Sequence, residues 1–261
     1  MLLAIDAGNT SITAGCLEGG SLLCRAQFSA ERRTADELAV LMGQALRMRG
    51  VDTAAFEGAV MSCVVPPLLE MLRGAVRLVT GHDPLVVGAG VKTGLNIGID
   101  DPSQMGADLV AGAVAALDMR ETPVIVIDMG TATTISVIGP NARLLGGAIM
   151  PGAAVALEAL SGTASLLPRV SLEAPRRCIG SGTIECMKSG AVFGAASAID
   201  GMIDRMEAEL GGKAAVVATG GLAQHIIPYC RHEIEIDDYM LLRGLSLIWQ
   251  RNRRERRREA K

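Results

Sequence analysis

Aromatic residues are scarce in this sequence, with three Phe, two Tyr and one Trp among 261 residues. Small and aliphatic residues dominate instead, and 49% of the chain is apolar. A chain of this length and apolar content can bury a sizeable core, and its small and branched side chains suit closely packed layers of strands and helices. The composition therefore favours a globular α/β protein with one large domain or two small ones.

The cysteine and histidine patterns that bind zinc are missing. Six cysteines are scattered without a Cys-x-x-Cys spacing, and the three histidines do not cluster with them. Structural zinc sites need such closely spaced ligands. We expect reduced thiols and no zinc site.

Segments typical of export or membrane insertion are also lacking. The first apolar run contains Asp6 and has no basic residue before it, so it predicts a strand and not a signal peptide. Near the C-terminus, the uncharged stretch 214–230 is interrupted by Gly220, Gly221 and Pro228, which argues against a membrane helix. We expect a cytoplasmic protein that does not associate with membranes.

The net charge is −3, but it is unevenly distributed. Residues 251–261 carry six Arg and one Lys against two Glu. Such a tail could contact nucleic acid, although a short run of Arg and Glu is more often a solvated helix end. No aromatic residue accompanies it for base stacking, so we expect no nucleic-acid binding.

One strand motif occurs twice in the chain. Residues 2–10, Leu-Leu-Ala-Ile-Asp-Ala-Gly-Asn-Thr, are echoed by residues 124–133, Val-Ile-Val-Ile-Asp-Met-Gly-Thr-Ala-Thr. Each copy predicts an apolar strand that ends in Asp-x-Gly, at Asp6 and at Asp128, followed by a second strand, a turn and a third strand. Two β-meanders are therefore expected to open two similar halves.

Helical patterns follow each meander, with apolar residues spaced three and four apart in 35–49 and 190–210. We expect residues 1–118 to form an N-terminal lobe and residues 119–250 a C-terminal lobe, with 251–261 as a basic tail. Duplicated lobes of this kind would place both Asp-x-Gly turns at a nucleotide cleft between them.

The glycine-rich turns suit the binding of a nucleotide. Glycine lets the backbone approach a phosphate closely, and the preceding Asp can hold a cation. One such turn is also ordinary hairpin chemistry, but two copies in equivalent strand contexts favour phosphate binding. A third signal, Thr219-Gly220-Gly221, follows the predicted strand 214–218 and would either pack against an adenosine ring or form a plain strand-to-helix turn.

Six segments together resemble the motif set of type III pantothenate kinases. They are residues 6–10, 106–108, 128–134, 146–152, 163–168 and 219–221. The resemblance extends from Asp6 to about residue 252. It implies an α/β fold of duplicated ribonuclease-H-like lobes, as in actin-like ATPases, with a nucleotide cleft between them.

The resemblance also implies an activity. Enzymes of this family transfer the γ-phosphate of ATP to pantothenate, which gives 4′-phosphopantothenate in the first step of coenzyme A biosynthesis. The expected cofactors are ATP, Mg²⁺ and a monovalent cation, K⁺ or NH₄⁺. The expected assembly is a homodimer or a hetero-oligomer with a related chain.

Individual residues can be carried over from the motifs. Nucleotide contacts are implied for Asp6, Ala7, Gly8, Asn9, Thr10, Ser11, Ile12, Thr13, Thr131, Gly220 and Gly221. Substrate contacts are implied for Gly106, Ala107, Asp108, Leu109 and Thr183. Asp108 would accept the hydroxyl proton, Asp128 would bind the monovalent cation, and Asp6 would bind a metal ion. Without the resemblance, the favoured interpretation of Asp108 is a carboxylate that stabilises the N-terminus of a helix over 109–117.

The sequence departs from the family pattern near the expected acceptor site. Leu109 stands where the family has Arg, Ile99 where it usually has Tyr, and Gln104 where it often has Glu. An Arg would give a forked, charge-assisted contact typically worth about 1.5–3 kcal/mol, which Leu cannot supply. Three interpretations follow: a pantothenate kinase active alone or with a related chain, a non-catalytic regulatory partner of a paralogue, and a kinase for another small alcohol.

Overall fold

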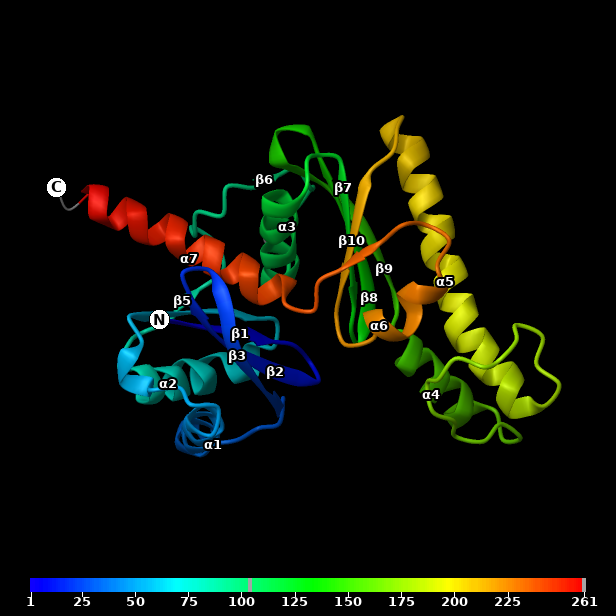
Figure 1. The fold of residues 1–261 in the computed structure, drawn as a ribbon, viewed down its shortest axis with the longest axis horizontal. Coiled ribbons are helices and arrows are strands. Elements are labelled where there is room, and N and C mark those ends of the chain that lie inside the picture. The colour runs from blue at the N-terminus through cyan, green and yellow to red at the C-terminus, as the bar shows by residue number, and fades with distance from the viewer. Residues whose placement is uncertain (103–104, 260–261) are drawn as a thin grey trace. The chain divides into compact units, whose positions relative to one another are not determined.

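The chain forms two compact units in a computed structural model that describes residues 1–102 and 105–259, with side chains described up to residue 254 (Figure 1). Unit 1 comprises residues 1–95, 100–118 and 239–261, and unit 2 comprises residues 96–99 and 119–238. This division differs from the expected ranges because the chain returns to unit 1 after residue 238, where the last helix packs on the first sheet.

Unit 1 contains a five-stranded sheet in the order β3-β2-β1-β4-β5. Its strands are β1 (Leu2–Ala7), β2 (Ser11–Glu18), β3 (Ser21–Ser29), β4 (Gly58–Cys63) and β5 (Leu85–Val86). The first three form an antiparallel meander, and β4 lies parallel to β1 on its other side. The carboxyl ends of β1 and β4 therefore meet at one edge of the sheet.

Helices cover both faces of this sheet. They are α1 (Ala35–Arg47), α2 (Leu69–Thr80), α3 (Ala107–Met119) and α7 (Met240–Glu259). Because side chains alternate along a strand, Leu3 and Ile5 of β1 pack in the core with α1 and α2, whereas Leu2 and Ala4 pack in the core with α3 and α7. Thr34 is the N-cap of α1 and forms a capping box with Glu37, so that the helix begins at Ala35.

Unit 2 repeats the arrangement of unit 1. Its strands are β6 (Asn96–Ile97), β7 (Val124–Met129), β8 (Ala132–Gly139), β9 (Arg143–Pro151), β10 (Ala215–Thr219) and β11 (Glu235–Ile236), and they lie in the order β11-β10-β7-β8-β9-β6. The series β9-β8-β7-β10-β11 has the same order and directions as β3-β2-β1-β4-β5. The duplicated α/β fold predicted from the repeat is confirmed.

The helices of unit 2 are α4 (Ala153–Thr163), α5 (Thr183–Leu210) and α6 (Ala223–Ile226). Ile125 and Ile127 of β7 pack in one core with Val192 and Ile199 of α5. Short 3-10 turns complete the described elements of both units: Thr53–Ala55, Pro66–Leu68, Pro140–Ala142 and Ile227–Tyr229.

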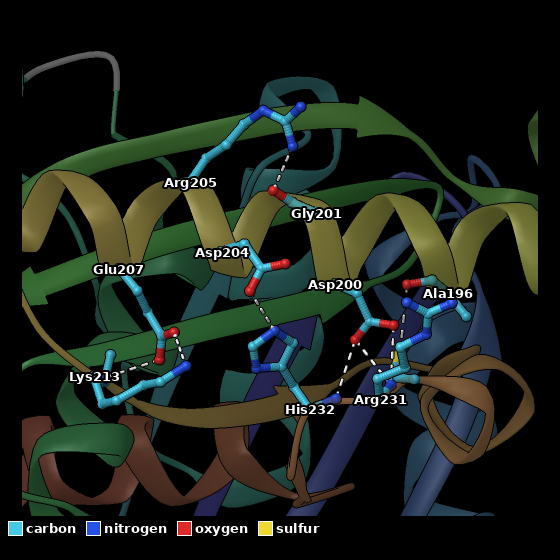
Figure 2. A network of polar contacts seen from close by, with 11 residues as sticks. Ala196, Asp200, Gly201, Asp204, Arg205, Glu207, Lys213, Arg231 and His232 are labelled. Carbon is cyan, nitrogen blue, oxygen red and sulfur yellow. Dashed lines mark hydrogen bonds and ion pairs between the residues drawn. The ribbon is translucent and has the colours of Figure 1, made fainter.

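Acidic side chains on α5 fix the segment that follows α6 (Figure 2). Asp200 accepts backbone N–H groups of Arg231 at 2.9 Å and His232 at 3.2 Å, and Asp204 lies 3.0 Å from His232 Nε2. Glu207 pairs with Lys213 at 2.6 Å. Ligand atoms of Asp204, Glu207 and His232 lie within 4.8 Å of one another, but each already takes part in a protein contact: Asp204 and His232 contact each other, and Glu207 contacts Lys213 and Ala214, between α5 and β10.

The expected basic tail begins inside α7 and is attached to unit 1. Arg251 hydrogen-bonds to the carbonyl oxygen of Thr93, and Asn252 Nδ2 donates to the carbonyl oxygen of Lys92 at 3.0 Å. Arg253 forms an ion pair with Glu57 at 2.6 Å. The first residues of this segment therefore contribute to the packing of α7.

Among the helices in the part of the chain that the structure describes, none is long and apolar enough to cross a membrane. The six cysteines are free thiols.

Candidate active site

The first Asp-x-Gly turn lies at the carboxyl end of β1. Asp6 is the fifth residue of the strand and faces Thr13 across the β1–β2 hairpin. Residues 8–11 form the turn, in which Gly8 N–H donates to the carbonyl oxygen of Ser11 at 3.0 Å. The predicted phosphate-binding residues thus lie on a tight hairpin whose strands are held by the sheet.

The second turn has the same construction in unit 2. Asp128 lies near the end of β7 and faces Thr134 across the β7–β8 hairpin, and Gly130 N–H donates to the carbonyl oxygen of Ala132 at 2.9 Å. Only residues 130–132 lie between the last paired residues, so this turn is one residue shorter than the first. The sequence repeat is therefore reproduced as a repeat of local geometry.

Gly152 supports the second turn. Its N–H donates to the carbonyl oxygen of Thr131 at 3.1 Å, and a methyl group on Gly152 would lie 2.5 Å from the carbonyl oxygens of Gly130 and Thr131. A side chain at this position would displace the turn backbone. The motif 146–152, recognised in the sequence without a physical role, thus ends in a residue that holds the Thr131 turn in place.

The third glycine motif lies against Asp128. Thr219 is the direct neighbour of Asp128 in the parallel pair of β10 and β7, and Leu222 N–H donates to the carbonyl oxygen of Met129 at 3.0 Å. Between them, Gly220 packs on the end of β7. The two motifs of unit 2, around Asp128 and around Gly220, therefore form one continuous surface.

Asp108 lies in the first turn of α3, as predicted. Its Oδ1 accepts the backbone N–H of Leu109 at 2.8 Å. Burial raises the pKa of Asp108, while hydrogen bonds from backbone N–H groups lower it, and the net shift is upward. A carboxylate with a raised pKa accepts a proton more readily than an ordinary Asp. The helix N-terminal position and the base role therefore do not exclude each other.

In unit 1, Asp108 lies close enough to Asp6 for its negative charge to raise the pKa of Asp6. The pKa of Asp6 is raised to about 6: burial is the largest cause, a hydrogen bond from Ser62 acts against it, and the negative charge of Asp108 adds to it. Two carboxylates that repel each other form a site suited to a cation, because a bound positive charge would relieve the repulsion. This donor set fits a hard divalent ion such as Mg²⁺.

Ser62 is a residue of this site that sequence reasoning missed. Its Oγ donates to Asp6 Oδ1 at 2.6 Å, and the side chain is completely buried. The only available signal was a polar residue directly after the apolar run 58–61. Ser62 can be assigned to this site only when β4 is known to lie beside β1.

Thr183 is the first residue of α5 and lines an open hollow of about 660 Å³ in unit 2. The lining residues are Ser165, Leu166, Leu167, Pro168, Gly182, Thr183, Ile184 and Glu185. The hollow therefore joins the motif 163–168 to the segment that precedes α5. Its lining mixes polar residues with exposed apolar ones, among them Leu166, which is 91% exposed, and Ile184, which is 50% exposed.

The remaining predicted residues are divided between the units. Leu109 belongs to unit 1, next to Asp108, whereas Ile99 belongs to unit 2. Gln104 lies outside the described residues. The acceptor-side departures from the family pattern are therefore spread over two units and not confined to one loop.

Comparison with known proteins identifies the family. The family model described as type III pantothenate kinase matches residues 2–205. A type III pantothenate kinase of Moorella thermoacetica is 43% identical over 253 residues, which cover 97% of this chain and 100% of the relative. Another, from Myxococcus xanthus, is 41% identical over 97% of this chain and 99% of its own.

A solved structure supports the fold independently. The activator of 2-hydroxyisocaproyl-CoA dehydratase from Clostridium difficile, determined with bound ADPNP, superposes with a TM-score of 0.57 at 14% identity, over 100% of this chain and 98% of that protein. At this identity the likeness concerns the fold alone. Together with the order of the motifs along nearly the whole sequence, the comparisons show that this chain belongs to the type III pantothenate kinase family.

Proposed function

We propose that this chain transfers the γ-phosphate of ATP to pantothenate and so produces 4′-phosphopantothenate, the first step of coenzyme A biosynthesis, in the cytoplasm. Family membership supports the reaction. The observation in the structure that supports it most is the effect of Asp108 on Asp6, two carboxylates of unit 1 that come from distant parts of the sequence and would act at one site.

The nucleotide would be held by backbone and side-chain groups of both hairpin turns. Residues 8–13 and Thr131 would contact phosphates, and Gly220 and Gly221 would face the adenosine. Asp6 would hold Mg²⁺, which neutralises phosphate charge when bound. Asp128 would bind a monovalent cation, K⁺ or NH₄⁺. The turn geometry supports these roles because each turn presents a glycine directly after a strand that ends near an Asp.

Asp108 would act as the base for the acceptor alcohol. The carboxylate takes the proton of the pantothenate hydroxyl, the hydroxyl oxygen forms a bond to the γ-phosphorus, and the bond to the β-phosphate oxygen breaks to release ADP. Burial of Asp108 supports this role because it favours the protonated form that the step creates.

The acceptor side would need completion. Leu109 cannot make the polar contact that the family's Arg makes, and Ile99 replaces a Tyr, so we infer that a second subunit or a different alcohol is involved. Exposed apolar side chains that line the hollow support the first option, since Leu166 and Ile184 remain open to solvent in the single chain. The second subunit would be either another copy of this chain or a related one.

A phosphorylation assay tests the proposal directly. The purified chain is incubated with ATP, Mg²⁺, K⁺ and pantothenate, alone and after co-expression with any paralogue, and phosphopantothenate is measured by mass spectrometry. Formation of product that Asp108→Asn abolishes would support the kinase. Product only with the paralogue, unaffected by Asp108→Asn in this chain, would instead identify a regulatory partner. If product forms only when another small alcohol replaces pantothenate, that alcohol is the acceptor.

A further inference from the structure

A buried hydroxyl lies beside the first Asp of the duplicated motif. Ser62 is the direct partner of Asp6 in the parallel pair of β4 and β1, and its Oγ donates to Asp6 Oδ1 at 2.6 Å. Ser62 is 0% exposed, so this hydroxyl has no access to water. Its contact with Asp6 satisfies a buried polar group that would otherwise be costly.

The second half of the molecule has a hydroxyl at the equivalent place. Thr219 is the direct partner of Asp128 in the parallel pair of β10 and β7, and it is 2% exposed. In both halves the preceding strand residues are small or apolar, and the first hydroxyl appears at the position beside the Asp. If these positions served core packing alone, Ala or Val would suffice. The repeat of a polar residue at one register position points to a role in the site.

We propose that Ser62 is a positioning residue that holds the Asp6 carboxylate for the metal–nucleotide complex. The hydrogen bond engages Oδ1 and restricts the rotation of the carboxylate, so that its orientation is set before a ligand binds. This inference rests on the proposed nucleotide role of Asp6 and adds a residue that the motif does not contain.

The geometry makes Ser62 suited to this task. Both residues lie on neighbouring strands of one sheet, so their separation is set by the backbone ladder and not by a mobile loop. A hydrogen bond to an ionised carboxylate is stronger than one between neutral groups. The negative charge of Asp108 repels the Asp6 carboxylate. A hydrogen-bond donor on the neighbouring strand opposes rotation of the Asp6 side chain away from Asp108.

Binding of Mg²⁺ with a non-hydrolysable ATP analogue, measured by isothermal titration calorimetry, tests the proposal without turnover. Ser62→Ala should weaken binding by about tenfold or more, because the carboxylate loses its charge-assisted partner. Ser62→Thr retains the hydroxyl and should restore most of the affinity. Thr80→Val is the matched control: Thr80 is a buried hydroxyl of unit 1 that donates to the carbonyl oxygen of Val76 at 2.8 Å, away from the site.

A double-mutant cycle separates positioning from a general loss of structure. If Ser62 acts through Asp6, Ser62→Ala should cause no further loss in a protein that already carries Asp6→Asn. An equal loss in both backgrounds would overturn the proposal. Ser62→Cys, which replaces the hydroxyl with a somewhat larger thiol that is a weak donor, serves as a second variant if Ser62→Ala unfolds, and it should bind the nucleotide more weakly than the unchanged protein.

The same titrations distinguish failure of this inference from failure of the proposed function. Weakened binding in Asp6→Asn together with unchanged binding in Ser62→Ala would overturn the role of Ser62 alone. Unchanged binding in Asp6→Asn would remove the nucleotide role of Asp6 and, with it, the reason for a positioning residue.

Discussion

Gly220 lies directly against the carboxylate of Asp128, so that a methyl group on Gly220 would lie 2.5 Å from Asp128 Oδ1. Gly220 also has a φ of +94°, a backbone conformation that residues with a Cβ rarely adopt. A methyl group on the neighbouring Gly221 would meet no atom within 4 Å, and Gly221 has no such φ. The two glycines of one motif therefore have different physical requirements.

Gly220→Ala should destabilise the protein, whereas Gly221→Ala should not. We expect a loss of about 1–3 kcal/mol in unfolding free energy for Gly220→Ala, because backbone strain and the collision with Asp128 act together. Urea unfolding followed by circular dichroism measures the difference. Equal stability of the two variants would contradict the close packing of Gly220 on β7.

Asp108→Asn should lower turnover strongly, whereas binding of the metal–nucleotide complex, which depends mainly on Asp6, should change much less. The amide keeps an oxygen that can accept the Leu109 N–H but cannot take the alcohol proton, so kcat should fall by about 10²–10⁴-fold. Steady-state kinetics of the active assembly and calorimetric nucleotide titration check the two parts. Asp118→Asn, at the exposed far end of the same helix, is the control and should leave kcat unchanged.

Leu109→Arg should improve the use of pantothenate by the isolated chain. The new guanidinium can form charge-assisted contacts with the acceptor. The KM for pantothenate should therefore fall by about tenfold or more, with little change in the KM for ATP. Leu109→Met adds length without charge and should give no gain. If the unchanged chain already has an ordinary KM for pantothenate and Leu109→Arg does not alter it, the acceptor site does not depend on an Arg at this position.

Asp6→Asn should stabilise the cation-free protein at neutral pH. The folded pKa of Asp6 is about 6 and its reference value is 3.8, so the folded state binds more protons between these values. Its contribution to stability is therefore fully present below about pH 4 and is lost as the pH rises through 6. Asp6 keeps partial exposure, which limits the difference to on the order of 2 kcal/mol above pH 7.

Urea unfolding in EDTA at several pH values measures this effect as the difference between Asp6→Asn and the unchanged protein. The difference should shrink towards zero as the pH falls to 4. A difference that does not depend on pH would show that Asp6 titrates normally in the folded chain.

The sequence alone determined the local elements and their duplication. A continuous apolar run before each Asp-x-Gly predicts the strands that end near Asp6 and Asp128, and the structure has them as β1 and β7. These features could be predicted because short apolar runs and turn glycines depend on residues close together in the chain. The family could likewise be recognised from the order of the motifs, because each motif is a short stretch of neighbouring residues.

Tertiary structure alone decided which distant residues became neighbours. Nothing near Ser62 in the sequence indicates Asp6, because their contact depends on β4 pairing with β1 across 56 residues. The return of α7 to unit 1 likewise depends on Leu242 and Leu245 burying their side chains with Leu2 and Ala4 of the first strand. Burial and sheet register are properties of the folded chain, and no local pattern encodes which of several apolar faces will pair.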